Sequence, residues 1–180
     1  MGADASFIAR TMDRDPKHLQ AMLLRSQAHK GASFLEIYQN CNIFNDGAFE
    51  IFTEKKTKPD EVLFLEQGKP LIFGATQNKG IKLDGFKPVI ADLEAGASAD
   101  DLWIHDERDF YKAQILIRMF DDPKLEGHLP RPFGVFYETD RACYEDSLTM
   151  QIEEVIARKG KGDLDKLLRG NETWEISATA

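Results

Sequence analysis

Cysteine is scarce in this chain, which has Cys41 and Cys143 as its two thiols among 180 residues. Two thiols are too few for a disulfide framework, and the sequence therefore fits a reducing compartment. No apolar run reaches the roughly 20 residues that a membrane helix needs. The N-terminus also lacks a basic region followed by an apolar core and a small-residue cleavage site. These absences predict a cytoplasmic protein without a membrane segment.

Long basic runs are missing as well. The chain has 23 Lys and Arg against 31 Asp and Glu, with a formal net charge of −8, so attraction to a nucleic-acid backbone is not expected. The short run from 55 to 58 is interpreted as a solvated charge cluster. No phosphate-binding P-loop, dinucleotide-binding G-x-G-x-x-G or nucleophile elbow is found, which argues against kinase, nicotinamide and hydrolase chemistry.

The four histidines are scattered, and none has the spacing of a zinc site: His18, His29, His105 and His128. His105 precedes two acidic residues, and an acid–base pair there is a weaker interpretation than surface hydration of adjacent charges. Cys143 has no partner at ligand spacing. It is interpreted as a packing residue near the start of a helix.

What the sequence does contain is a strand pattern that runs into a polar loop. Phe34, Leu35, Ile37 and Tyr38 are bulky or β-branched, which favours a strand in a sheet covered on both faces. The polar residues that follow end the strand and place Cys41 at its carboxyl end. In open α/β sheets ligands collect at that edge, because loops there aim side chains from a rigid support. A thiolate at this position is a candidate metal ligand.

The preceding residues complete a β-α-β unit. A short strand is predicted at 5–10, and Asp15 followed by Pro16 has the pattern of a helix start. Gly31 is suited to end that helix. A right-handed crossover then places the two strands parallel, adjacent or nearly so, in one sheet.

Beyond Gly47 the pattern changes to shorter elements. A short amphipathic turn or helix is predicted at 48–56. A hairpin is predicted from strands at 62–65 and 71–73 around a turn at 66–70, and strands at 81–83 and 87–90 are predicted to extend it. Further predictions are a strand at 102–105, a helix at 110–120, a strand at 132–136, a helical stripe at 148–156 that ends at Gly160, and a final short helix at 164–168.

Four segments carry a family resemblance: GADASFIAR at 2–10, DRDPKHL at 13–19, QNCNIFNDG at 39–47 and GNETW at 170–174. With them the chain resembles the thiamine-diphosphate-binding β subunit of 2-oxoacid:ferredoxin oxidoreductases, in particular the 2-oxoglutarate type, over nearly its whole length. The loop that holds Cys41 is the most specific of the four. The resemblance is to the C-terminal half of that subunit.

The resemblance implies a chemistry that needs more than this chain. Cys41 would supply the fourth thiolate of a 4Fe-4S cluster whose other three cysteines lie earlier in the subunit. Asn42, Asn45 and Asp46 would surround that cluster, although ordinary turn formation explains them about as well. Thiamine diphosphate and Mg²⁺ would also be bound upstream. The implied partners are an α subunit, ferredoxin, a 2-oxoacid and coenzyme A, and the reaction is oxidative decarboxylation to an acyl-CoA.

These inferences predict an α/β fold with three parts. Residues 1–57 would be the C-terminal part of a thiamine-diphosphate-binding parallel-sheet domain, 58–100 a small antiparallel appendage, and 101–180 an α/β region with terminal helices. Without an upstream half, the first strands would leave an apolar sheet edge and helix face uncovered. The chain alone is therefore expected to be inactive. The alternatives are a non-catalytic module that binds the α subunit or ferredoxin, and an unrelated small α/β enzyme.

Overall fold

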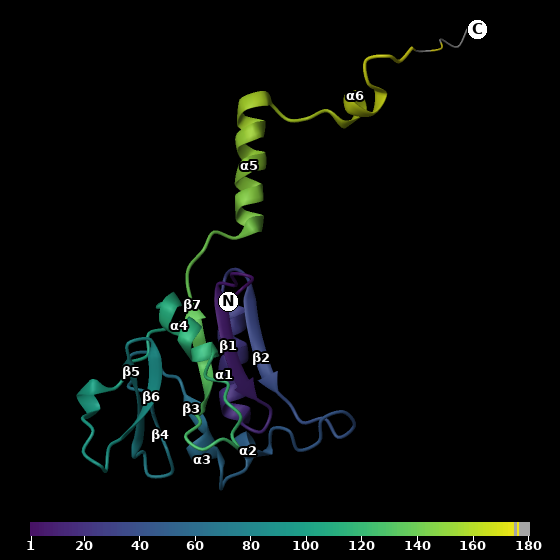
Figure 1. Cartoon of the computed structure of the whole chain (residues 1–180). Helices are drawn as coiled ribbons and strands as arrows, with labels where there is room; N and C mark the ends of the chain where they lie inside the picture. The colour runs from purple at the N-terminus through teal and green to yellow at the C-terminus, as the bar shows by residue number, and fades with distance from the viewer. Residues whose placement is uncertain (175, 177–180) are drawn as a thin grey trace. The chain divides into compact units, whose positions relative to one another are not determined.

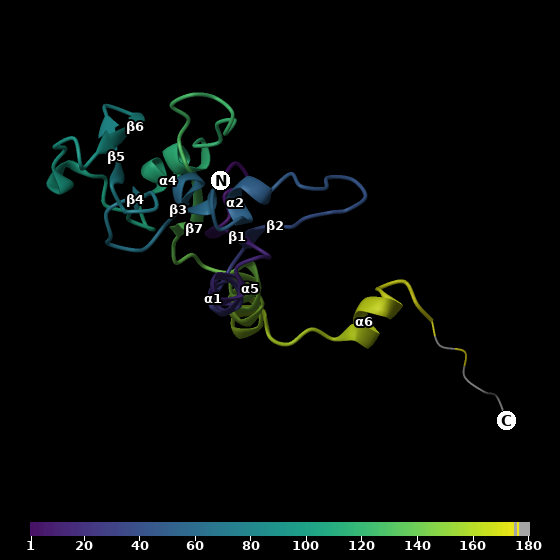
Figure 2. The same ribbon diagram turned by 90° about the horizontal axis from the view of Figure 1, so that it is seen from below.

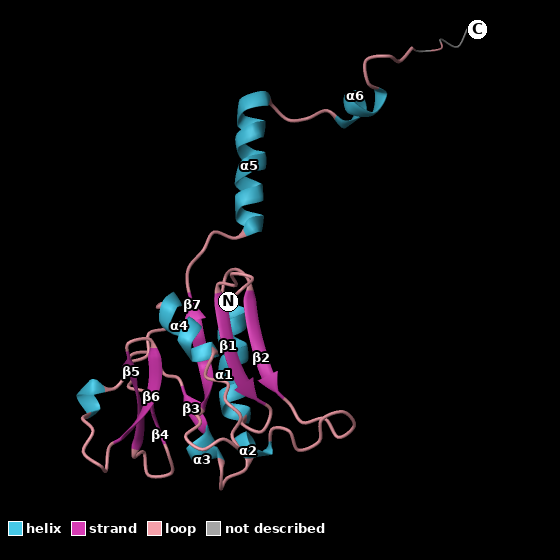
Figure 3. Cartoon of the chain, viewed as in Figure 1, coloured by secondary structure: helices cyan, strands magenta, loops and turns pink. Residues whose placement is uncertain are grey.

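The computed structural model describes residues 1–174 and 176 and divides into two compact units, Met1–Arg141 and Ala142–Ala180. The first unit contains two sheets and the helices that cover them (Figures 1 and 3). The second contains two helices. Each unit is described by itself.

The larger sheet of the first unit has four strands in the order β2-β1-β7-β3, formed by β1 (Phe7–Met12), β2 (Ser33–Tyr38), β3 (Val62–Phe64) and β7 (Arg131–Glu138). Strands β1 and β2 are parallel, β7 runs antiparallel to β1, and β3 is parallel to β7. The sheet is therefore mixed, with two directions that meet between β1 and β7.

Helix α1 (Pro16–Ala28) connects the two parallel strands. Its first turn is closed by Asp15, whose carboxylate accepts a hydrogen bond from the backbone N–H of His18 at 3.2 Å. Its buried residue, Met22, packs against Phe7 and Val135 of the sheet. The predicted β-α-β unit with two adjacent parallel strands is confirmed.

Strand β2 is at the edge of the sheet, and this corrects one expectation. Its residues were predicted to be covered on both faces, yet Phe34 is 59% exposed and Ile37 is 41% exposed, while Tyr38 is buried. The two exposed side chains point to opposite faces, because side chains alternate along a strand. No strand among the described residues pairs with the free edge of β2, so the expected apolar edge is present.

Strand β7 lies at the centre of the unit and is buried from Arg131 to Tyr137. It has a register shift opposite Ile8 and Ala9, where Phe136 is the extra residue, and Gly134, two residues earlier, has a φ of +128°. A side chain at position 134 would bring its Cβ within 2.8 Å of the Leu65 carbonyl oxygen. Glycine allows β7 to pass the chain beyond β3 at this close approach.

The smaller sheet is antiparallel, in the order β4-β5-β6, with strands β4 (Ile72–Phe73), β5 (Lys79–Asp84) and β6 (Lys87–Asp92). The predicted hairpin of 62–65 with 71–73 is wrong, because β3 pairs with β7 and β4 pairs with β5. Leu63 is fully buried, and parallel pairing with β7 places this short apolar strand at one edge of the larger sheet. The strands predicted at 81–83 and 87–90 do pair, as β5 and β6.

Short helices and one extended segment complete the first unit: α2 (Glu50–Thr53), α3 (Lys58–Glu61), the 3-10 helix Ala99–Asp101 and α4 (Phe110–Ile117). The segment predicted as a strand at 102–105 is extended, with a single bridge between Ile104 and Pro70. Helix α4 ends before the predicted residue 120. The chain turns after Ile117 and places Met119 in the core while Phe120 is largely exposed.

The second unit contains α5 (Tyr144–Lys159) and α6 (Leu164–Arg169). Both predicted helices are confirmed, and Gly160 ends α5 with φ at +83°. Cys143 directly precedes α5, as predicted. Within the described residues, no helix is long and apolar enough to cross a bilayer.

The predicted fold class is confirmed. A sheet with parallel strands and a separate antiparallel sheet together make a mixed α/β architecture. The division at 57 and 100 stays a prediction.

Candidate functional site

The loop that follows β2 begins at the carboxyl ends of the two parallel strands. Tyr38 is the last residue of β2, and Cys41 forms an isolated bridge with Asn45 inside the loop. Figure 2 shows this loop reaching outward beyond the sheet. The predicted position of the cysteine, just past the end of a strand, agrees with the structure.

Backbone donors surround the sulfur of Cys41. Hydrogen bonds from the backbone N–H groups of Phe44, Ile43 and Asn45 lower the pKa of the Cys41 thiol. Such donors stabilise the negative charge of a thiolate, which is the form that binds metals. The loop thus presents a sulfur prepared for the charged state.

One side chain missed by the sequence interpretation organises this loop. Asn40 Nδ2 donates to Asp46 Oδ1 at 3.0 Å and to Asn42 Oδ1 at 3.2 Å, while Asn40 Oδ1 accepts from the N–H of Gly47 at 2.9 Å. Asn42 and Asp46 therefore contact Asn40. Asn45 closes the loop through its backbone, with its N–H on the Cys41 carbonyl at 2.9 Å. Asparagine side chains commonly form hydrogen bonds with the backbone of a loop, so the sequence contained a general signal for this role. It did not distinguish Asn40 from the other polar residues beside it.

Two large apolar side chains lie beside the sulfur and face solvent. Ile43 is 83% exposed and Phe44 is 89% exposed. Apolar side chains at a loop tip are unusual where nothing covers them, and they suit a contact with another polypeptide. The two residues whose backbone N–H groups lower the pKa of Cys41 most therefore also expose large apolar side chains.

The base of the loop is rigid because Tyr38 is packed into the core. The Tyr38 ring stacks on Phe49 at 4.4 Å between centroids and meets Phe133 edge-on at 5.2 Å. Arg131 donates to the Tyr38 hydroxyl at 2.8 Å, and Arg10 lies over the Tyr38 ring. The support of the loop is therefore fixed by aromatic and guanidinium contacts, three residues before the cysteine.

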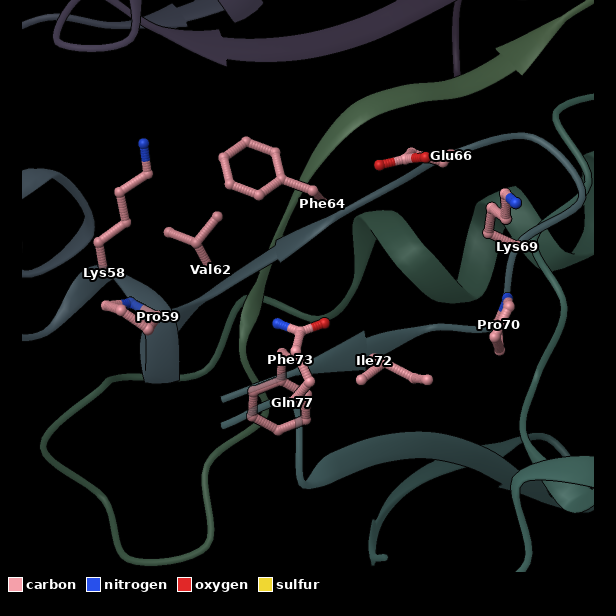
Figure 4. A pocket seen from close by; sticks show the side chains of 10 residues that line it. All are labelled: Lys58, Pro59, Val62, Phe64, Glu66, Lys69, Pro70, Ile72, Phe73 and Gln77. Atoms are coloured by element: carbon pink, nitrogen blue, oxygen red, sulfur yellow. The ribbon is translucent and has the colours of Figure 1, made fainter. Parts of the chain in front are cut away.

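A separate open cleft of about 560 Å³ lies between the larger sheet and β4 (Figure 4). Its walls are apolar, with Phe64 on one side and Ile72 and Phe73 on the other, and Lys58 and Lys69 stand at its two ends. Lys58 is already paired with Asp15 at 2.7 Å. Besides Lys58, the titratable side chains that line this cleft are Glu66 and Lys69.

The histidines serve the fold. His105 was interpreted as lying on the surface, but it is 1% exposed and its Nε2 lies 2.8 Å from the Val135 carbonyl oxygen. The pKa of His105 is lowered because the effect of burial is larger than the opposite effect of the Val135 carbonyl and the nearby carboxylates, which raise it. His18 Nδ1 lies 2.8 Å from the Thr11 hydroxyl, and burial also lowers its pKa. Among the residues that the structure describes, no group of three His, Cys, Asp or Glu side chains could hold a metal ion.

Sequence comparison decides the relationship. The chain is 30% identical over 179 residues to the 2-oxoglutarate oxidoreductase subunit KorB of Mycobacterium tuberculosis (strain ATCC 25618 / H37Rv), across 98% of this chain. The chain is a relative of KorB. The same alignment covers 47% of KorB, so the chain spans about half the length of this relative. No family model matches the chain.

Structural comparison agrees with this relationship. The 2-oxoglutarate:ferredoxin oxidoreductase from Magnetococcus marinus, solved with 2-oxoglutarate, coenzyme A and succinyl-CoA bound, superposes on 91% of this chain with a TM-score of 0.51 and 16% sequence identity. The superposition covers 39% of that larger chain. It supports the fold. The resemblance predicted from the sequence, to a subunit of 2-oxoacid:ferredoxin oxidoreductases of the 2-oxoglutarate type, is confirmed.

The residues of this loop could supply one of the ligands of an iron–sulfur cluster. Cys41 offers a soft sulfur with backbone donors around it, which is the environment that such clusters require. A cluster normally needs four thiolates, and the described residues place no second cysteine in this loop. Among the described residues, no group of three His, Cys, Asp or Glu side chains is placed to hold Mg²⁺ either. The loop can therefore contribute a ligand but cannot hold the cofactors by itself.

Proposed function

We propose that this chain is the portion of a KorB-type β subunit that carries Cys41 to a 4Fe-4S cluster in a 2-oxoacid:ferredoxin oxidoreductase. The complete enzyme would decarboxylate a 2-oxoacid, 2-oxoglutarate in the preferred interpretation, and form an acyl-CoA. Thiamine diphosphate with Mg²⁺, held by the other half of the subunit, would supply the carbanion chemistry. Electrons would leave through the cluster to ferredoxin.

The observation that carries this proposal is the sulfur environment of Cys41. The backbone N–H groups of residues 43 to 45 lower the pKa of this thiol, which lies just past the end of strand β2. A buried structural cysteine needs no such donors, since it behaves as a small apolar residue. In the proposed assembly these donors stay on the sulfur and adjust the reduction potential of the cluster.

The free edge of β2 supports the need for a second half. Phe34 and Ile37 expose apolar surface on opposite faces, and Leu23 and Leu24 of α1 are also about half exposed. A parallel strand added at this edge, with helices on both faces of the extended sheet, would bury apolar side chains of this kind. The chain covers 47% of KorB, which leaves more than enough sequence in such a subunit for this addition.

The test uses the chain assembled with the remaining half of the subunit and the α subunit. Wild-type, Cys41→Ser and Cys143→Ser complexes are compared for iron content and for the electron paramagnetic resonance signal of the reduced cluster. We expect Cys41→Ser to lose the cluster signal while the complex still assembles, and Cys143→Ser to retain it. Equal iron in all three complexes would exclude Cys41 as a ligand and favour the non-catalytic binding module.

A further inference from the structure

Helix α5 has an apolar stripe that no described residue of its own unit covers. Leu148, Ile152, Val155 and Ile156 recur at four- and three-residue spacing, which places them along one face. Their side chains are 39–51% exposed, and no residue of α5 is buried within the described chain. A helix of 16 residues, about 24 Å long, is marginal without a packing partner.

The charges of α5 are segregated along its length. Its first turn contains Glu145 and Asp146, and its last turn contains Arg158 and Lys159. This polarity agrees with the helix dipole and stabilises each end. It also makes the helix complementary to a second copy of itself that runs in the opposite direction, because the acidic end of one copy then meets the basic end of the other.

The register of such a pair follows from the sequence. If two antiparallel copies cross at Ile152, residues equally far before and after that position lie opposite each other. Leu148 of one copy then meets Ile156 of the other, and Glu145 meets Lys159, since each member of the second pair is seven residues from the centre. Two-fold symmetry repeats every contact. A single crossing point at Ile152 therefore brings the apolar side chains of the two copies together and also pairs their oppositely charged ends.

We propose that α5 is a self-association element, through which two copies of this chain pair in antiparallel orientation about Ile152. A single helix pair of this length buries less than the roughly 1,200 Å² of a typical stable interface. The dimer is accordingly weak and dissociates on dilution. In a larger assembly the contact adds to other interfaces and joins two protomers. This inference rests on α5 alone and does not depend on the proposed cluster.

The first experiment measures association of the full chain by analytical ultracentrifugation across a wide concentration range at low salt. Ile152→Glu places two carboxylates at the crossing point, and Ala157→Glu makes the same change on the opposite face of the helix. We expect Ile152→Glu to remain monomeric where the wild type and Ala157→Glu dimerise. Circular dichroism checks that all three retain the helix. A wild type that stays monomeric throughout, or a dimer unaffected by Ile152→Glu, overturns the proposal.

The second experiment tests the register. Glu145→Lys alone opposes lysine to lysine in a pair of like copies, and Lys159→Glu alone opposes glutamate to glutamate. Each variant should dimerise about three- to ten-fold more weakly than the wild type, in the range expected for two exposed charge pairs. An equimolar mixture of the two variants places opposite charges together at both ends and should regain wild-type affinity. A mixture no tighter than either variant alone rules out the antiparallel pair and indicates docking to another surface.

Discussion

At the scale of single residues, the thiol of Cys41 is defined by its loop. The backbone donors at 43 to 45 lower its pKa, and Asn40 holds the loop in the shape that directs them. The sequence located Cys41 at the end of a strand but could not indicate which neighbour controls the sulfur. That role depends on where Asn40 points after folding, and the bulk pattern of Asn and Asp in the loop is compatible with many arrangements.

We expect Cys41 to react with iodoacetamide at a lower pH than an unstructured thiol. The measurement uses the Cys143→Ser background, so that Cys41 is the sole thiol, and records the alkylation rate against pH in native buffer and in denaturing urea. The native profile should rise at lower pH, because the folded loop stabilises the thiolate. Asn40→Ala should move the native profile toward the unfolded one, whereas superimposed native and unfolded profiles would contradict the loop's effect.

The buried histidines make stability dependent on pH. His105 and His18 have folded pKa values lowered chiefly by burial, so the unfolded chain binds more protons below about pH 6.5. Stability present above that pH is therefore lost as pH falls. His128 acts in the opposite direction. Burial lowers its pKa, but hydrogen bonds to the Leu125 carbonyl and to Glu61 outweigh burial and raise it.

We expect the unfolding free energy of the chain, measured by urea titration, to fall between pH 7 and pH 5. His105→Gln should flatten this fall by up to about 1 kcal/mol for each pH unit, because one proton-binding difference is removed. His128→Gln is the matched control of opposite sign and should steepen the fall. Parallel slopes for both variants and the wild type would show that neither histidine is linked to folding.

At the scale of elements, one ion-pair cluster connects segments far apart in the sequence. Arg25 of α1 donates two hydrogen bonds to the carboxylate of Glu107, at 2.9 and 2.6 Å, and a further one to Glu138 at the end of β7. The side chain of Glu107 is 10% exposed. Removing Arg25 would leave this buried carboxylate without its cation.

Arg25→Ala should lower the unfolding free energy by about 2 kcal/mol, less than a fully buried pair because Arg25 itself is partly exposed. Arg108→Ala provides the control, since Arg108 pairs with Asp140 at 3.1 Å and both side chains face solvent. Its loss should cost under about 1 kcal/mol. Chemical denaturation measures the unfolding free energy of both variants. Equal losses of unfolding free energy would show that the buried pair with Glu107 stabilises the fold no more than the exposed pair does.

Local patterns predicted most elements, and the errors occurred where pairing is long-range. Helices α1, α5 and α6 follow from capping residues and helical spacing close in sequence. Strand β3 did not follow, because its partner β7 lies about 70 residues later and a nearby turn favoured a hairpin with β4. The exposure of β2 was also missed. An apolar sequence predicts a strand, but it does not show whether other parts of this chain cover that strand.

At the scale of the whole molecule, the edge of β2 is where the proposed second half of the subunit would pair. Replacing both Phe34 and Ile37 with Lys should leave the unfolding free energy nearly unchanged, because both side chains already meet solvent. It should reduce binding of a hydrophobic dye by the isolated chain and prevent assembly with the other half of the subunit. Phe86→Lys, at an 87% exposed position, should change neither dye binding greatly nor assembly. Normal assembly of the double variant would remove this edge from the proposed interface.

The close approach at Gly134 has a consequence for recognising other chains of this kind. The position excludes every side chain for a reason of space, since the carbonyl of Leu65 occupies the volume that a Cβ would need. The proposed iron ligand, Cys41, lies in a loop, whereas the crossing of β7 past the chain beyond β3 has no room for a larger residue at position 134. A glycine there is accordingly a marker of shared architecture that outlasts any change in chemistry.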